Sequence, residues 1–190
     1  MKSTFLLILS CILFGCGGGS GESSGSDNTA TNPSTLVPEA PQQFTGTFVD
    51  APVEGLNYVT ETFSGTTNSQ GEFNYLANET VTFSIGAITF PAVNAASVIT
   101  PLNLFNTEDI NNRLVVNALR LLQSLDQDGI VSNGIQIPSL VHELAQDITI
   151  DFSSDNFDQQ INVLLNLAST FNFTLVSVED ATYHFQQTLE

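Results

Sequence analysis

The chain has 190 residues, of which 20 are acidic and only 3 are lysine or arginine, so its formal net charge at pH 7 is −17. Such an acidic surface repels phosphate backbones and argues against nucleic-acid binding. Both cysteines, Cys11 and Cys16, stand near the N-terminus. A disulfide framework, a thiol nucleophile and a cysteine metal site are therefore excluded beyond residue 16.

The first fifteen residues have the pattern of a secretory signal peptide. Lys2 gives a positive start, and residues 5–14 form an apolar run too short to span a bilayer. The run ends in LFGC, which resembles the lipobox of bacterial lipoproteins, whose cysteine, here Cys16, is acylated and becomes the mature N-terminus. Gly17 follows, and by the same resemblance this indicates lipid anchoring in the outer membrane. An ordinary secretory signal is the alternative.

Residues 16–43 are rich in Gly and Ser and contain almost no large apolar side chain. Such a segment buries too little apolar surface to offset the entropy of ordering, so we expect a flexible tether. Residues 44–190 are long enough for one domain with its own core. Loss of Lys2 with the signal leaves two arginines against 20 acidic residues, a mature formal charge of about −18.

Residues 44–104 predict a β-rich half. Alternation of apolar and polar residues is clearest at Phe73 and Tyr75 and in the run that begins at Val81. Gly86 predicts either a bulge or a tight turn that makes a hairpin of 80–85 and 87–91. Short strands at this spacing are typical of an antiparallel sandwich or small barrel. The expected strands are 44–49, 56–62, 72–76 and 80–90, with turns at 50–52, 64–65, 68–71 and 77–78.

Residues 105–190 predict a helical half, so the fold class is α+β in one domain. The first helix is expected over 110–125, with Thr107 as N-cap and with Arg113, Asn117, Arg120 and Ser124 on its polar face. Two more are expected at 139–147 and 155–169, and a last one after a capping box at Ser177 and Asp180. Segments 148–152 and 171–176 are expected as short strands or extended connections. Side chains expected to face inward are Phe157, Ile161, Leu164, Leu165 and Ala168 in the third helix and Val178, Ala181, Phe185 and Leu189 in the fourth.

Parts of the sequence resemble two known protein families. Residues 49–90, VDAPVEGLNYVTETFSGTTNSQGEFNYLANETVTFSIGAITF, resemble the transthyretin-like or carboxypeptidase-regulatory-like β-sandwich modules. Over 44–190 the chain resembles an uncharacterised module of lipid-anchored or secreted gammaproteobacterial proteins, through ITPLNLF, NALRLLQSLDQDGIVSNGIQIP and SVEDATYHF. This second resemblance implies a surface-exposed accessory or binding module rather than an enzyme. The positions that recur in that module are Asn117, Arg120, Asp126, Asp128, Gly129, Asn133, Gly134 and His184.

No catalytic residue is predicted. The stretch HELAQ at 142–146 begins like a zinc motif, but Gln146 stands where the second histidine ligand is required. His184 lies beside the apolar face of the last helix and is expected either as a buried hydrogen-bonding residue or as part of a site. Arg113 and Arg120 are expected to brace their helix through ion pairs and carbonyl contacts, or to recognise an anionic ligand.

The stretch SLDQDGIVSNG, 124–134, predicts either a plain loop after the helix or a weak calcium site. In the EF-hand register Ser124 and Ile135 replace the first and last acidic ligands, which excludes a high-affinity loop. Asp126, Asp128, Asn133 and the carbonyl of Ile130 remain as oxygen ligands.

The predicted function is a noncatalytic surface accessory or binding module, for adhesion or for an envelope or extracellular protein or glycan partner. The first alternative is a calcium-stabilised structural envelope protein with no other ligand, and the second is an extracellular enzyme of unrecognised type.

Overall fold

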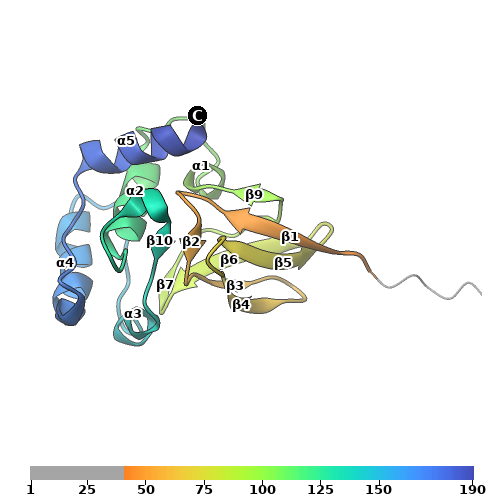
Figure 1. The fold of residues 1–190 in the computed structure, drawn as a ribbon, viewed down its shortest axis with the longest axis horizontal. Helices are drawn as coiled ribbons and strands as arrows, with labels where there is room; N and C mark the ends of the chain where they lie inside the picture. Colours follow the sequence, from red (N-terminus) through yellow and green to blue (C-terminus); the bar gives the residue numbers. More distant parts are fainter. Residues whose placement is uncertain (1–40) are drawn as a thin grey trace, which may run out of the picture. The chain divides into compact units, whose positions relative to one another are not determined.

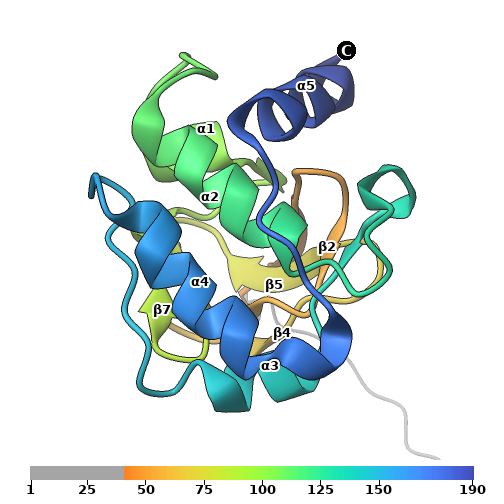
Figure 2. The same cartoon turned by 90° about the vertical axis from the view of Figure 1, so that its left-hand side faces the viewer.

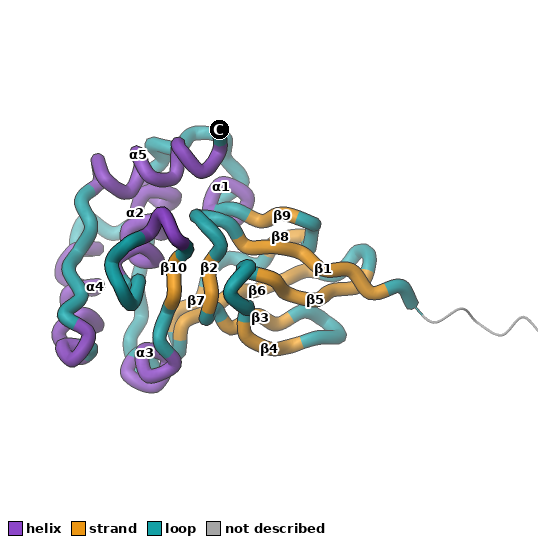
Figure 3. Tube along the Cα trace, viewed as in Figure 1, coloured by secondary structure: helices purple, strands orange, loops and turns teal. Residues whose placement is uncertain are grey.

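The computed structural model describes residues 41–190, which lie within one compact unit. The expected signal peptide, Cys16 and the tether as far as residue 40 lie outside the described residues. As predicted, the fold is α+β, with mostly antiparallel sheets in the N-terminal half and helices in the C-terminal half (Figures 1 and 3). Within residues 41–190, no helix is both long and apolar enough to cross a membrane.

Within residues 41–190, ten short strands form three small sheets. One sheet has the order β5-β1-β9, a second has the order β4-β3-β6-β7 with β8 also paired to β6, and β10 pairs with β2. The pairs β1–β9 and β10–β2 are parallel, and the other named pairs are antiparallel. The strands are β1 (Gln43–Phe48), β2 (Val53–Glu54), β3 (Asn57–Val59), β4 (Ser64–Thr66), β5 (Glu72–Leu76), β6 (Thr80–Ile85), β7 (Ile88–Thr89), β8 (Val93–Asn94), β9 (Val98–Ile99) and β10 (Ile135–Gln136).

Aromatic side chains from the two larger sheets contact one another in the core. The ring of Phe83 on β6 lies edge-on to Phe48 of β1 and to Phe73 of β5, with centroids 4.8 and 5.2 Å apart. Phe73 also contacts Tyr58 of β3 at 5.9 Å. Edge-to-face pairs of this kind stabilise a core beyond the area they bury.

The hairpin prediction at Gly86 is confirmed, because this residue turns the chain between β6 and β7 with φ +57°. The prediction of a turn at 64–65 is wrong, since both residues belong to β4. Gly65 stands opposite Tyr58 in the register, and a Cβ there would lie 3.2 Å from the tyrosine ring. The glycine is therefore used to admit an aromatic side chain rather than to turn the backbone.

The helices cover one end of the strand layers. Figure 2 shows α4 in front of α2, with α5 across the top and the strands behind. Helix α2 is central, because ten of its 12 residues are buried. The helices are α1 (Pro101–Leu104), α2 (Arg113–Ser124), α3 (Ser139–Leu144), α4 (Phe157–Leu167) and α5 (Val178–Leu189), with 3₁₀ turns at Val131–Asn133 and Ser169–Phe171.

Two details of the helix predictions are wrong. Helix α2 begins at Arg113 and not at residue 110, because the side chain of Asn112 caps it by accepting the Leu114 N–H at 3.0 Å. Thr107 instead accepts the Asp109 N–H in a local turn. On α5, Val178 and Leu189 are exposed rather than inward, because they lie in the first and last turns.

The inward faces of the last two helices otherwise agree with the prediction. All five expected residues of the third helix are buried, from Phe157 to Ala168. On α5, Ala181 and Phe185 are buried, and the side chain of Ser177 accepts the Asp180 N–H at 3.0 Å, as a capping residue does. The segments 148–152 and 172–177 are extended connections without strand pairing.

Candidate functional site: the end of helix α2 and the cleft beside it

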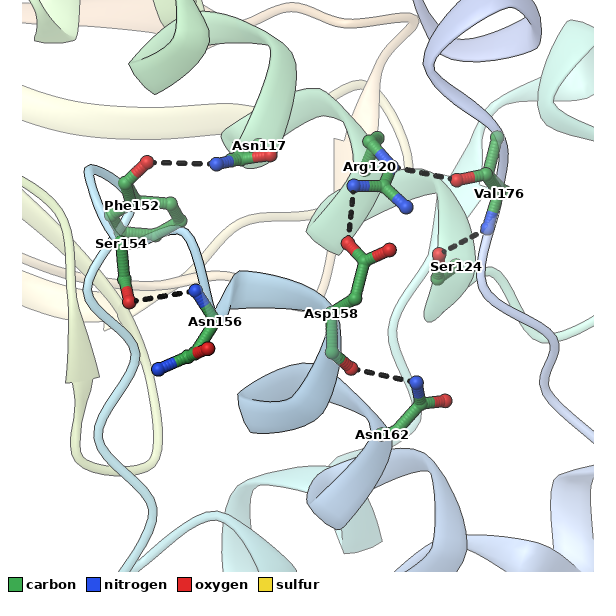
Figure 4. A network of polar contacts seen from close by, with 9 residues as sticks. All are labelled: Asn117, Arg120, Ser124, Phe152, Ser154, Asn156, Asp158, Asn162 and Val176. Carbon is green, nitrogen blue, oxygen red and sulfur yellow. Dashed lines mark hydrogen bonds and ion pairs between the residues drawn. The ribbon is translucent and has the colours of Figure 1, made fainter.

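The polar face predicted for α2 exists, and three of its four residues are buried, whereas Arg113 is exposed. Asn117, Arg120 and Ser124 are all below one-tenth exposed. Figure 4 shows why: Asn117 Nδ2 donates to the Phe152 carbonyl at 2.8 Å, and Ser124 Oγ accepts the Val176 N–H at 2.9 Å. These side chains supply hydrogen-bond partners for main-chain groups of Phe152 and Val176, which lie outside any sheet.

Arg120 is the central member of this network. Its Nε donates to the Val176 carbonyl at 2.8 Å, and its Nη1 pairs with Asp158 Oδ1 at 2.7 Å (Figure 4). The guanidinium also lies over the ring of Phe157, 5.4 Å from the centroid. Arg113 pairs with Asp155 in the same direction, toward the start of α4. The prediction of ion pairs and carbonyl contacts is confirmed for Arg120, whereas Arg113 makes an ion pair without a carbonyl contact.

His184 contacts a residue that sequence reasoning did not single out. Its Nε2 donates to the main-chain carbonyl of Asp50 at 2.8 Å. The Asp50 side chain is fully buried and accepts from Gln123 Nε2 at 3.1 and 3.2 Å. Burial raises the pKa of the Asp50 carboxyl well above its ordinary value of 3.8. An aspartate in a turn before Ala-Pro is ordinary, so no local signal identified it.

His142 is held by main-chain groups and by one amide side chain. Its Nδ1 accepts from Asn57 Nδ2 at 3.0 Å and from the Gly86 N–H at 3.2 Å. Its Nε2 lies 2.7 Å from the Gly55 carbonyl and therefore carries the ring proton. It lines a cleft of about 520 Å³ that is otherwise formed mostly by amide, hydroxyl and carboxylate side chains.

The loop that follows α2 is closed by its own hydrogen bonds. Asp128 Oδ1 accepts the Ile130 N–H at 2.8 Å, and Oδ2 accepts from Asn133 Nδ2 at 3.0 Å. The bond from Asn133, followed by that from Ile130, lowers the pKa of Asp128. Gln127 N–H donates to the Gln136 carbonyl at 2.9 Å and pins the loop to β10. Asn133 therefore orients Asp128.

Asp126 lies at the root of this loop and is 3% exposed. Its Oδ1 accepts the Gln136 N–H at 2.9 Å, whereas its buried Oδ2 has no hydrogen-bond partner among the described residues. Desolvation raises the pKa of Asp126, and the neighbouring negative charge of Asp128 raises it further. Within residues 41–190, no group of three or more His, Cys, Asp or Glu side chains is arranged to hold a metal ion.

Asp126 and Asp128 both line a cleft of about 480 Å³ between the loop and the segment 171–177. Phe171 and Phe173 are among its lining residues, and their rings stack on each other 5.1 Å apart at 15°. Asn172, Thr174 and Asp180 add amide, hydroxyl and carboxylate groups. The structure thus brings two of the four predicted calcium ligands, Asp126 and Asp128, to one cleft, while Asn117, Arg120 and His184 serve the packing around α2.

No protein-family model, no curated protein and no solved structure matches this chain. The two family resemblances noted in the sequence therefore stay predictions.

Proposed function

We propose that the chain is a lipid-anchored protein of the bacterial outer membrane that acts as a noncatalytic binding module for an extracellular glycan. The observation that supports the binding role is the cleft beside the end of α2, which Phe171 and Phe173 line together with amide, hydroxyl and carboxylate groups. A sugar ring presents an apolar face and a rim of hydroxyls, which need this combination of partners.

The charge of the chain narrows the class of glycan. A formal charge of −17 repels anionic polysaccharides, so a neutral oligosaccharide is the expected ligand. A noncatalytic role is supported by the two histidines, since His142 and His184 direct ring nitrogens to main-chain atoms of Gly55, Gly86 and Asp50. A general base needs a ring nitrogen directed at substrate.

Binding is tested by titrating the full chain with a panel of neutral oligosaccharides while following amide resonances. We expect shifts in 126–131 and 171–177, and loss of these shifts in Phe173→Ala. Phe44→Ala is the matched control, because Phe44 also stacks on a neighbouring ring, that of Tyr75 at 5.6 Å, but outside the cleft. Shifts that are absent for every sugar, or that survive Phe173→Ala unchanged, contradict the proposal.

Anchoring is tested separately with Cys16→Ser. Acylation of Cys16 predicts that the wild-type chain takes up labelled palmitate and sediments with membranes. The serine variant should lose the label and move to the soluble fraction. A variant that sediments as before would show that another feature holds the protein.

A further inference from the structure

Asp126 is a buried carboxylate that pairs with no arginine of residues 41–190. Only 3% of its surface is exposed, and its Oδ2 has no hydrogen-bond partner among the described residues. The two arginines of residues 41–190 are already paired, Arg113 with Asp155 and Arg120 with Asp158. Asp126 must therefore be neutralised by a proton or by a cation from solution.

Three features around Asp126 favour a cation. The second carboxylate, Asp128, is two residues further along the chain and lines the same cleft, so two acidic side chains lie close together. Both residues follow directly on the C-terminus of α2, where the helix dipole adds further negative potential. Asn133 and the Ile130 N–H hold the Asp128 carboxylate in place beside the cleft.

We propose that Asp126 and Asp128 bind one calcium ion at the wall of this cleft. Carboxylate oxygens are hard ligands that suit calcium, and the ion tolerates irregular coordination completed by water. Two protein carboxylates are few for a calcium site, so affinity on the order of 10⁻⁴ to 10⁻³ M is expected. The site is independent of glycan binding, because the ion neutralises Asp126 whether or not the cleft holds a ligand.

The test is thermal unfolding of the full chain, stripped of metal, in about 10 mM calcium chloride, with sodium chloride at matched ionic strength as reference. Occupation of a millimolar site predicts a rise in melting temperature of about 3 to 6 °C. Asp126→Asn and Asp128→Asn should abolish this rise. Asn at 126 retains an oxygen for the Gln136 N–H, so this variant is expected to fold.

The matched control is Asp147→Asn, which removes the same charge from an exposed position outside the loop and the cleft. It should keep the calcium-dependent rise. Amide resonances provide a second readout, with calcium-dependent shifts expected at Ile130 and Gln136. A melting temperature that calcium leaves unchanged overturns the proposal and assigns the carboxyl a proton. A rise of equal size in all three variants also overturns it, because it indicates diffuse screening.

Discussion

Asp50 carries its carboxyl group into the interior, at the turn that joins β1 to β2. Its hydrogen-bond donor is the amide of Gln123, which also donates to the Ala181 carbonyl at 3.2 Å. One turn of the β half is thus fastened to α2 and α5 by uncharged partners. Because desolvation penalises the ionised form, the folded chain holds the Asp50 proton more tightly than the unfolded chain does.

We expect Asp50→Asn to change how stability depends on pH. A raised folded pKa means that the contribution of Asp50 is fully present below about pH 3.8 and is lost as pH rises through the folded value. Asparagine does not ionise, so the variant does not lose stability in this way as pH rises. It should be more stable than wild type at neutral pH by about 1 kcal/mol. Urea unfolding from about pH 4 to pH 8 measures the difference.

Other carboxyls, such as Asp151, whose pKa is lowered, also make stability depend on pH. They are present in both wild type and Asp50→Asn, so the difference between the two stability curves reports Asp50 alone. Asp147→Asn serves as control, because it changes the same net charge at an exposed position. Stability curves for wild type and Asp50→Asn that run parallel over the whole pH range would contradict the assignment.

At this scale, the sequence predicted the kind of contact better than it predicted the atoms that make it. Asn117, Arg120 and His184 were singled out, and each donates to a main-chain carbonyl, of Phe152, Val176 and Asp50 respectively. Their acceptors are backbone atoms in segments without periodic pattern. Side-chain type predicted that Arg120 and His184 form hydrogen bonds, but it gives no information about which main-chain atoms accept them.

Two glycines with left-handed backbone allow a prediction at the scale of single elements. Gly86 in the β6–β7 turn has φ +57°, and a Cβ there would lie 2.6 Å from the His142 carbonyl and 2.8 Å from Ala145. Gly129, in the loop after α2, has φ +70° and open space around it. The hairpin turn is therefore packed against the end of α3, whereas the loop is not.

We expect Gly129→Ala to cost about 1 kcal/mol for the left-handed conformation alone, and Gly86→Ala about 3 kcal/mol because a clash is added. Denaturant unfolding of the two variants gives both values. Equal losses would show that α3 yields to the added methyl group.

The elements themselves were predictable where a period of two or 3.6 runs over several residues, as in β5, β6 and α4. The start of α2 was not, because Thr107 and Asn112 are both good capping residues, and only their hydrogen bonds distinguish them. Strands β2 and β10 have two residues each and therefore no period to read.

Over the whole molecule, one apolar cluster unites the two halves. It includes Phe48 and Phe90 from the β half and Leu121, Phe152 and Ile161 from the helical half. The rings of Phe90 and Phe152 stack at 5.3 Å. The prediction of one domain agrees with this continuity, although neither half contains the complete core.

We therefore expect residues 1–104 alone not to fold, since their part of the cluster would be exposed to water. Near-ultraviolet circular dichroism should show no fixed aromatic environment for this fragment, in contrast to the full chain. A cooperative thermal transition of the fragment would show that the sheets suffice without the helices.

The contact between His184 and the Asp50 carbonyl has a consequence for the order of events in folding. The two residues are 134 positions apart in the sequence. Val53 and Ile135, paired between β2 and β10, are also distant along the chain. Contacts of such long range slow folding, because the intervening loop must close before they form. The turn at Asp50 emerges early during synthesis, yet it acquires its last hydrogen-bond donor only when almost the entire chain has been made.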